Sequence, residues 1–365
     1  RALADFIIEF EVRCDDQGTS GIQFRSHVLQ DGEMCGYQAE FDPDNAKVGC
    51  TGGIYDEGPG GRGWLFKPDC ETIKTIQKPM GQWNDYKIQA LGDRLQTWLN
   101  GEKITDIRDH RNRSGIIAFQ VHSGKKPVHV SFRRLRLADL GDGSGWKPLF
   151  NGKNLDGWRT QGEPNVWRVE DGQIVGELVK PSPYAYLATQ KTFDDFELKL
   201  DMKFDSDQGN SGVFFRCTFP PQCAQCNEMA RKLPEHVSDF ECAKCGHTAA
   251  RPMTERVHIH GPQAEFAPAK HTGAPTAAIY DARGHGWVNL EKVTDHMKKM
   301  NREKDWNELR LLARGNHVMA WLNGYLISDI SDYEFPKEGI IALQMHETKE
   351  AIKVRFKNIE IRPLK

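Results

Sequence analysis

The chain has 365 residues, a length that suits two domains better than one. Hydrophobic residues make up 38% and charged residues 27% of the chain, so each half can bury a core, and no apolar run reaches the ~20 residues of a membrane-spanning helix. The 49 basic and 51 acidic residues give a net charge of -2, which argues against the basic surface of a general nucleic-acid binder. With 34 glycines and 18 phenylalanines, the composition favours turns and aromatic-rich strands over a helical bundle.

The chain opens on an alternating pattern of apolar residues. Phe6, Ile8, Phe10 and Val12 recur at every second position, which predicts a β-strand with one face toward a core. The same pattern returns over residues 196–202.

This return is part of a long internal repeat. Residues 83–110 align without gaps with residues 306–333, and both stretches contain Trp-Asn, Trp-Leu-Asn-Gly and Asp-Ile-x-Asp. Four shorter blocks keep the same order: 5–25 with 195–216, 38–41 with 263–266, 54–56 with 279–281, and 115–122 with 339–346. The sequence therefore predicts a duplicated domain.

The repeated blocks predict antiparallel sheets. Asn100-Gly101 and Asn323-Gly324 lie between apolar runs, which is the strongest short signal for a hairpin turn. Closely spaced strands with glycine-rich turns favour a sandwich. One charged segment in each copy, near residues 70–78 and 291–303, is expected to form a short helix at the rim.

The boundary between the copies follows from composition. We expect a first domain over residues 1–140, a polar glycine-rich linker over 141–145 and a second domain over 146–365. Copy one begins where copy two has already reached Thr192, so it has no counterpart of the stretch 146–187. We expect that its opening strands have been trimmed away, with an open sandwich as the alternative.

The order of the motifs resembles a known family. Residues 146–158 (WKPLFNGKNLDGW), residues 210–216 (NSGVFFR), the Trp-Leu-Asn-Gly hairpin and the Gln-x-His strand together resemble the 3-keto-disaccharide hydrolase family. The resemblance covers copy two apart from an insertion, and copy one from its third or fourth strand onward. It implies tandem concanavalin-A-like jelly-roll sandwiches, export to the periplasm or the medium of a bacterium, and activity on glycosides oxidised at C3 of the sugar.

Such chemistry makes specific demands on a site. A C3 ketone acidifies the hydrogen on C2, so a base can remove it and leave an enolate. The site then needs a base, a group that stabilises the enolate and a group near the glycosidic oxygen. The paired carboxylates of ordinary glycosidases are not required.

Copy two contains residues of these types on predicted strands. We expect His346 to be the base and Arg216 to anchor the enolate or a hydroxyl. Glu265 is expected to be an acid or the partner that fixes the histidine tautomer. Tyr280 would donate to the leaving oxygen, and Gln263 and Gln344 share faces with Glu265 and His346. The alternative for the whole set is a solvated sheet face with cross-strand ion pairs.

Copy one contains the same residue types and is expected to bind substrate, with or without turnover. Its candidate residues are Arg25, Gln38, Glu40, Tyr55, Gln120 and His122. Trp64 and Trp287 each follow a glycine-rich segment, so either tryptophan could stack on a sugar ring, with a core position as the alternative.

Copy two also has a long insertion, over residues 218–257. Within it, two Cys-x-x-Cys pairs are 15 residues apart, the spacing of a zinc ribbon, and we expect one closed structural zinc site, with two disulfides as the alternative. The ribbon could cover the cleft or mediate a homo-oligomer. His258 and His260 could instead hold a catalytic divalent cation, or form a hydrogen-bonded surface pair. The four cysteines are Cys223, Cys226, Cys242 and Cys245.

Together these observations predict a carbohydrate-active enzyme. Its substrate would be an oxidised glycoside or oligosaccharide, cleaved by hydrolysis or elimination, or hydrated, after removal of the C2 proton. The alternatives are a non-catalytic, lectin-like carbohydrate-binding protein and a scaffold that assembles through the ribbon, because a fold by itself does not determine function.

Overall fold

The structure is a computed structural model. It describes residues 1–16, 18–29, 31–44, 49–122, 128–163, 165–179, 183–219, 230–232, 240–242, 248–249, 259–268, 273–282 and 284–364. The chain divides into two compact units, each described below by itself. Unit 1 comprises Arg1–Ser144 with Asn323–Leu326, and unit 2 comprises Gly145–Leu322 with Ile327–Lys365.

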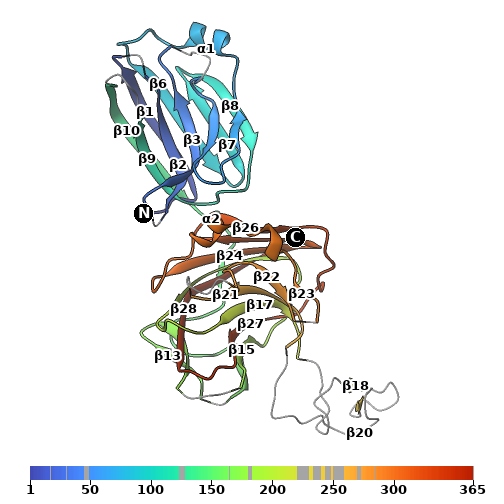
Figure 1. Cartoon of the computed structure of the whole chain (residues 1–365). Helices are drawn as coiled ribbons and strands as arrows, with labels where there is room; N and C mark the ends of the chain where they lie inside the picture. Colours follow the sequence, from blue (N-terminus) through green and yellow to red (C-terminus); the bar gives the residue numbers. More distant parts are fainter. Residues whose placement is uncertain are drawn as a thin grey trace. The chain divides into compact units, whose positions relative to one another are not determined.

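Unit 1 is built from two five-stranded antiparallel sheets (Figure 1). The first has the order β10 (Val130–Gly141), β1 (Asp5–Cys14), β6 (Asn84–Leu91), β7 (Arg94–Leu99) and β8 (Glu102–Arg108). The second has the order β5 (Gly63–Phe66), β4 (Ile54–Glu57), β3 (Met34–Phe41), β2 (Ser20–Val28) and β9 (Ile116–Val121). Alternate residues of both sheets form one core, in which Phe6, Phe24 and Tyr37 are fully buried.

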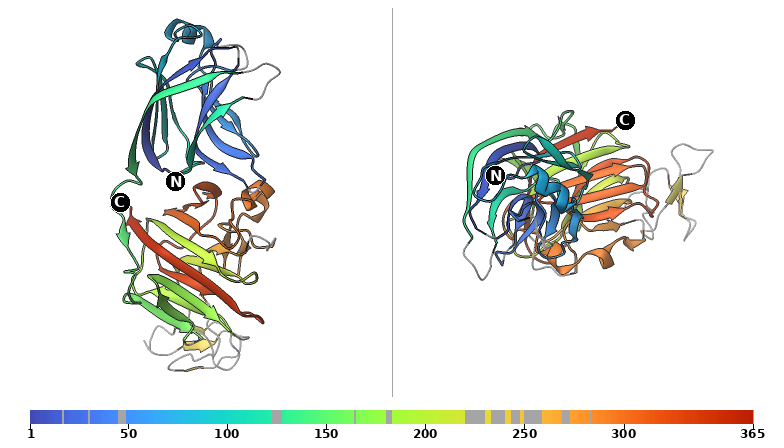
Figure 2. Two further views of the ribbon diagram at one scale, coloured as in Figure 1. Left: turned by 90° about the vertical axis from the view of Figure 1, so that its left-hand side faces the viewer. Right: turned by 90° about the horizontal axis from the view of Figure 1, so that it is seen from above.

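Unit 2 has two larger sheets, whose layers can be followed in Figure 2. The first has the order β13 (Trp167–Glu170), β14 (Gln173–Leu178), β28 (Ile352–Pro363), β16 (Phe196–Phe204), β24 (Asn307–Arg314), β25 (His317–Leu322) and β26 (Tyr325–Ile330), and β11 (Lys147–Pro148) also pairs with β28. The second has the order β12 (Trp158–Gly162), β15 (Ala185–Thr189), β27 (Ile340–Met345), β17 (Ser211–Cys217), β21 (Pro262–Phe266), β22 (Ile279–Asp281) and β23 (Gly286–Trp287).

The prediction of an all-β sandwich fold is confirmed. Helices are short: α1 (Cys70–Ile76) lies in the first charged segment, and η1 (Leu290–Lys292) and α2 (Asp295–Lys298) overlap the second. Among the described residues, no helix combines the length and the apolar character needed to cross a membrane.

The two units share one strand order. The run β28-β16-β24-β25-β26 of unit 2 follows the pattern of β10-β1-β6-β7-β8, and β27-β17-β21-β22-β23 follows that of β9-β2-β3-β4-β5. Unit 2 adds β13 and β14 beyond β28, and β12 and β15 beyond β27. As a result β27 is buried along its whole length, whereas on β9 of unit 1 Phe119 is 41% and Val121 64% exposed.

The insertion contributes a small sheet of β18 (Ala230–Lys232), β19 (Phe240–Cys242) and β20 (Thr248–Ala249). Cys223, Cys226, Cys245 and His258 lie outside the described residues, and Cys242 is described only as part of its strand. The zinc ribbon therefore stays a prediction.

A buried arginine fastens each sandwich at one end. In unit 2, Arg216 adopts the left-handed backbone region (φ 45°) at a bulge in β17, and its side chain is completely buried. The guanidinium donates to the backbone oxygens of Asp194, Gly315 and Pro336 at 2.6, 2.6 and 3.2 Å, and to the Asp195 carboxylate at 2.7 Å. One side chain thus ties three distant chain segments together.

Unit 1 repeats this arrangement at Arg25 (φ 46°). Its guanidinium donates to the backbone oxygens of Ala4, Gly92 and Asn112 at 2.8, 2.7 and 3.3 Å, and to the Asp5 carboxylate at 3.0 Å. Both units therefore have the same bulge and the same buried arginine.

Replacing Arg216 with methionine should lower the free energy of unfolding by about 3 kcal/mol, because three carbonyl groups and the partly exposed Asp195 carboxylate lose their donor. Urea unfolding followed by tryptophan fluorescence measures this change. The exposed Arg314, replaced in the same way, should change the free energy by less than about 0.5 kcal/mol. Equal effects of the two substitutions would contradict the role of Arg216 described above.

Candidate active site

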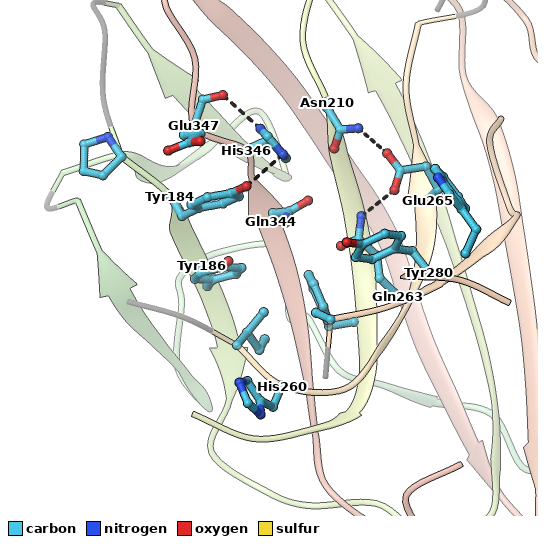
Figure 3. A pocket seen from close by; sticks show the side chains of 15 residues that line it. Tyr184, Tyr186, Asn210, His260, Gln263, Glu265, Tyr280, Gln344, His346 and Glu347 are labelled. Carbon is cyan, nitrogen blue, oxygen red and sulfur yellow. Dashed lines mark hydrogen bonds between the residues drawn. The ribbon is translucent and has the colours of Figure 1, made fainter. Parts of the chain in front are cut away.

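A cavity of about 490 Å³ lies on the face of the second sheet of unit 2 that points away from its core (Figure 3). Strand alternation explains its lining, because Val213, Leu343 and Met345 point into the core and their neighbours therefore point into the cavity. The cavity is lined by Pro183, Tyr184, Tyr186, Asn210, Phe214, Ile259, His260, Gln263, Glu265, Tyr280, Ala282, Trp287, Gln344, His346 and Glu347.

The register of four strands brings the polar residues into line. Tyr186 pairs with Gln344, Gln344 with Gly212, and Gly212 with Glu265, so one row crosses β15, β27, β17 and β21. Gly212 leaves a gap in this row, and the Gln263 side chain lies over it: a Cβ built on Gly212 would be only 2.1 Å from Gln263 Nε2.

Glu265 forms the acidic side of the cavity and is only 4% exposed. Gln263 Nε2 donates to one carboxyl oxygen at 2.9 Å, and Asn210 Nδ2 donates to the other. Burial raises the pKa of Glu265 to about 8, although both hydrogen bonds act in the opposite direction. At neutral pH this carboxyl group is therefore largely protonated and can donate a hydrogen bond or a proton.

An imidazole lies on the opposite side of the cavity, as Figure 3 shows. His346 Nδ1 lies 2.9 Å from the backbone oxygen of Glu347, and its Nε2 lies 2.9 Å from the Tyr184 hydroxyl. Because a carbonyl oxygen only accepts, Nδ1 carries the proton and Nε2 accepts from Tyr184. Burial raises the pKa of Tyr184 to about 12, so the phenol stays protonated unless the imidazole takes its proton.

Two buried acceptors in the cavity have no partner among the described residues. They are Gln344 Oε1 and Asn210 Oδ1, and Gln344 is 4% exposed. The amide nitrogens of both side chains are engaged, with Gln344 bonded to Tyr186 and Asn210 to Glu265. A ligand would therefore satisfy these oxygens by presenting hydrogen-bond donors, such as hydroxyl groups.

Aromatic rings form the remaining walls. Tyr184 and Tyr186 are parallel, with ring centroids 6.0 Å apart and an interplanar angle of 3°. Trp287 meets Tyr280 edge to face at 5.3 Å. Flat apolar surfaces beside hydrogen-bonding groups match the two kinds of surface on a pyranose ring.

The structure brings most of the predicted residues of copy two together. His346, Glu265 and Tyr280 line the cavity, and so do Gln263, Gln344, Trp287 and His260. The described residues hold no group of three metal-ligating side chains, so the divalent cation at His258 and His260 also stays a prediction.

The placement predicted for Arg216 is wrong, and so is that of Arg25 in copy one. Strict alternation would put Arg216 on the same face as Phe214, which does line the cavity. The bulge between Phe214 and Cys217 changes the phase of the strand, so the guanidinium enters the unit and is bonded there as described above. Neither arginine can anchor a ligand in the cavity.

Among the lining residues that sequence reasoning missed, Tyr184, Tyr186 and Asn210 carry polar groups that contact other residues of the site. The two tyrosines are two positions apart, which signals one strand face, but copy one has no counterpart for the comparison. Asn210 precedes its strand, and only the pairing of β17 with β21 and β27 brings it to Glu265.

On the equivalent face of unit 1, polar side chains form hydrogen bonds with one another. Gln23, at the position of Phe214, donates to Gln38 at 2.8 Å and to Glu57 at 3.1 Å, and Gln38 donates to Glu40 at 2.8 Å. Burial raises the pKa of Glu40 to about 7.

The other predicted residues of unit 1 lie at positions equivalent to those of their counterparts in unit 2. Tyr55 meets Trp64 edge to face at 5.3 Å, and Gln120 lies on β9 opposite Gly21. His122 is exposed and close enough to Glu57 to favour the carboxylate electrostatically. Unit 1 has no described strand that supplies a tyrosine pair beside β9.

Replacing Gly212 with alanine should raise the pKa of Glu265 above about 8, because the new methyl group displaces Gln263 and the carboxylate loses a donor. Infrared difference titration, with Glu265→Gln as the reference for band assignment, measures this pKa. At Gly273 an added Cβ meets nothing within 4 Å, so Gly273→Ala is the matched control. An unchanged Glu265 titration in Gly212→Ala would show that Gln263 does not set this pKa.

Comparison with known proteins identifies similar sequences in one family. The sequence model of the 3-keto-alpha-glucoside-1,2-lyase-like domain matches residues 1–138 and 145–362. A 3-keto-disaccharide hydrolase from Bacteroides thetaiotaomicron is 34% identical over 111 residues, which cover 26% of this chain and 38% of that protein. The match thus spans well under half of that relative's length.

Solved structures of low similarity were also found. The carbohydrate-binding module CBM66 from Bacillus subtilis is 14% identical, with 56% of this chain and 95% of that chain covered and a TM-score of 0.30. A β-1,3-1,4-glucanase (lichenase) from a mouse hindgut metagenome is 13% identical, with 57% and 93% covered and a TM-score of 0.33.

Proposed function

The chain belongs to the 3-keto-alpha-glucoside-1,2-lyase-like domain family, and from this premise we propose that unit 2 is an enzyme acting on glycosides oxidised at C3 of the sugar. One observation carries the proposal. A carboxyl group that is protonated at neutral pH and an imidazole–phenol pair face each other across one cavity. This is the acid and base pair that enolate chemistry requires.

The reaction would begin with removal of the C2 proton. Tyr184 Oη takes this proton as its own proton passes to His346 Nε2. The electron pair of the C2–H bond forms a C2–C3 double bond, and the π pair of the C3 carbonyl moves onto its oxygen. Glu265 donates a hydrogen bond to the enolate oxygen that forms. The enolate then re-forms the ketone, C1 and C2 become doubly bonded, and the C1–O bond breaks, with Tyr280 placed to protonate the departing oxygen.

Addition of water at C1 would be the reverse of the last step, with water in place of the alcohol. Elimination followed by this addition amounts to hydrolysis. The same acid and base therefore serve cleavage and hydration, and the proposal covers both.

The sugar would be held by groups that do not react. Gln344 Oε1 and Asn210 Oδ1 accept from two hydroxyl groups, which supplies the donors that these buried oxygens lack. The rings of Tyr186 and Trp287 border the cavity and offer apolar surface to the C–H face of a sugar.

We assign turnover to unit 2 rather than to unit 1. In unit 1 the side chains of Gln23, Gln38, Glu40 and Glu57 are hydrogen-bonded to one another, with Gln120 Oε1 left without a described partner, and the tyrosine pair is absent from the described strands of that unit. A binding role for unit 1, through Glu40, Tyr55, Gln120 and His122, fits this self-bonded face better than catalysis.

The remaining expectations rest on sequence and resemblance. The cysteine spacing supports a structural zinc in the insertion, with a homo-oligomer formed through the ribbon as one consequence. The family resemblance supports a periplasmic or secreted location.

Replacing His346 with alanine should lower kcat on a nitrophenyl 3-keto-glucoside at least about a hundredfold, because the Tyr184 proton loses its acceptor. Tyr184→Phe should lower kcat by a similar factor. Release of nitrophenolate measures turnover, and calorimetry measures affinity for the same ligand. A protein that only binds carbohydrate would show no turnover in any form.

The equivalent substitution in unit 1 is the control for this assignment. His122→Ala should leave kcat within about twofold of the original protein, since the base is assigned to unit 2. A large loss of kcat in His122→Ala with a small one in His346→Ala would reverse the assignment.

The activity should fall as the pH rises through about 8, the pKa of Glu265, because only the protonated carboxyl donates to the enolate. Above that pH, kcat/KM should drop about tenfold per pH unit. In Glu265→Gln the alkaline limb should disappear, since a carboxamide does not titrate. If the limb persists in Glu265→Gln, another group is responsible for it.

A further inference from the structure

Two cysteines of unit 1 lie together at a place that has no part in the proposed reaction. Cys50 Sγ is 3.4 Å from the backbone oxygen of Pro68, and Cys70 Sγ is 3.9 Å from the same oxygen. Cys70 Sγ is also 3.6 Å from the backbone oxygen of Gly49, the residue beside Cys50. The Cys70 thiol is close enough to the Cys50 thiol to raise the pKa of Cys50.

The pair joins two separate elements of unit 1. Cys50 is fully buried in the core just before β4, and Cys70 is half-buried as the first residue of α1, which is capped by the Asp69 side chain. The residues between them form β4 and β5 and include Tyr55 and Trp64. A covalent bond here would close a loop around this aromatic hairpin.

Unit 2 serves as an internal reference. By the ungapped blocks of the repeat, Cys50 corresponds to Pro275 and Cys70 to Val293. The sulfur pair is therefore specific to unit 1, the unit with fewer described strands and with an exposed apolar edge at β9. A smaller sandwich gains more from a cross-link, because it buries a smaller share of its surface.

We propose that Cys50 and Cys70 form a disulfide when the protein meets a low-molecular-weight disulfide such as oxidised glutathione. Cys70, the more exposed sulfur, attacks as its thiolate and displaces one glutathione thiolate, which takes up a proton. Cys50 then loses its proton, attacks the mixed disulfide and displaces the second glutathione. Two protein thiols are thus oxidised to one disulfide, and one glutathione disulfide is reduced to two thiols.

The burial of Cys50 determines when the disulfide can form. Burial raises the pKa of the Cys50 thiol, so this sulfur reacts slowly in the folded protein. The bond therefore forms most readily as the chain folds in an oxidising medium. It then restricts the unfolded chain between residues 50 and 70, which stabilises the folded state.

The full chain, refolded in a glutathione redox buffer, tests the proposal. Remaining thiols are blocked with N-ethylmaleimide, the protein is digested without reductant, and mass spectrometry should find a peptide that joins Cys50 to Cys70. The oxidised protein should melt about 5–10 °C above the reduced protein.

Variants separate this pair from the other cysteines. Cys70→Val introduces the residue that unit 2 has at the equivalent position. This variant and Cys50→Ser should each lack the linked peptide and lose the rise in melting temperature that the disulfide causes. Cys35→Ala, a change at a buried thiol elsewhere on β3, should keep the shift.

Two results would overturn the proposal. In one, the protein is refolded in oxidising buffer, denatured and treated with N-ethylmaleimide, and both Cys50 and Cys70 are found to carry the maleimide. The other is a melting shift of equal size in Cys70→Val and in the original chain. Neither result depends on whether the protein turns over a 3-keto glycoside.

Discussion

The fold and the site depend on a buried guanidinium in each sandwich. Arg216 in unit 2, like Arg25 in unit 1, can be buried because three carbonyl groups and a carboxylate satisfy its donors. Reaching those groups requires a bulge and a left-handed backbone at the arginine itself. The bulge shifts the phase of β17, so Phe214 before it faces the cavity and the arginine does not. The hydrogen bonds that Arg216 requires at one end of β17 thus determine which side chains of this strand face the cavity.

The cavity follows from that phase and from strand register. Residues two apart share a face, and the pairing of β15, β27, β17 and β21 sets them side by side. Gly212 matters because it has no side chain: the space is filled by Gln263, which in turn holds Glu265. Burial then opposes the charge on Glu265 more strongly than two amide donors favour it, and the result is a carboxyl group that can act as an acid at neutral pH.

The strand order that the two units share lets them be compared within one chain. The same register exists in unit 1, but Gln23 stands where unit 2 has Phe214, and Glu57 stands where it has Ala282. These two changes replace apolar lining with hydrogen-bonding groups that bond to one another. The shared strands therefore carry a hollow with two unpaired acceptors in unit 2, whereas in unit 1 Gln23 bonds to Gln38 and Glu57, and Gln120 Oε1 lacks a partner among the described residues. Two features therefore distinguish these faces: the side chains on the shared strands, and β15, which has no described counterpart in unit 1.

The sequence by itself determined the all-β class, the repeat and the short helices, because strand periodicity and turn residues are local properties of the chain. It also identified seven of the fifteen residues that line the cavity: alternation, for example, placed Gln344 with His346 and Gln263 with Glu265. Only the tertiary structure decided the position of Arg216, because a bulge depends on distant carbonyl groups that complete its hydrogen bonds. The contributions of Tyr184 and Asn210 likewise depend on cross-strand register, which brings residues far apart in the chain within hydrogen-bonding distance.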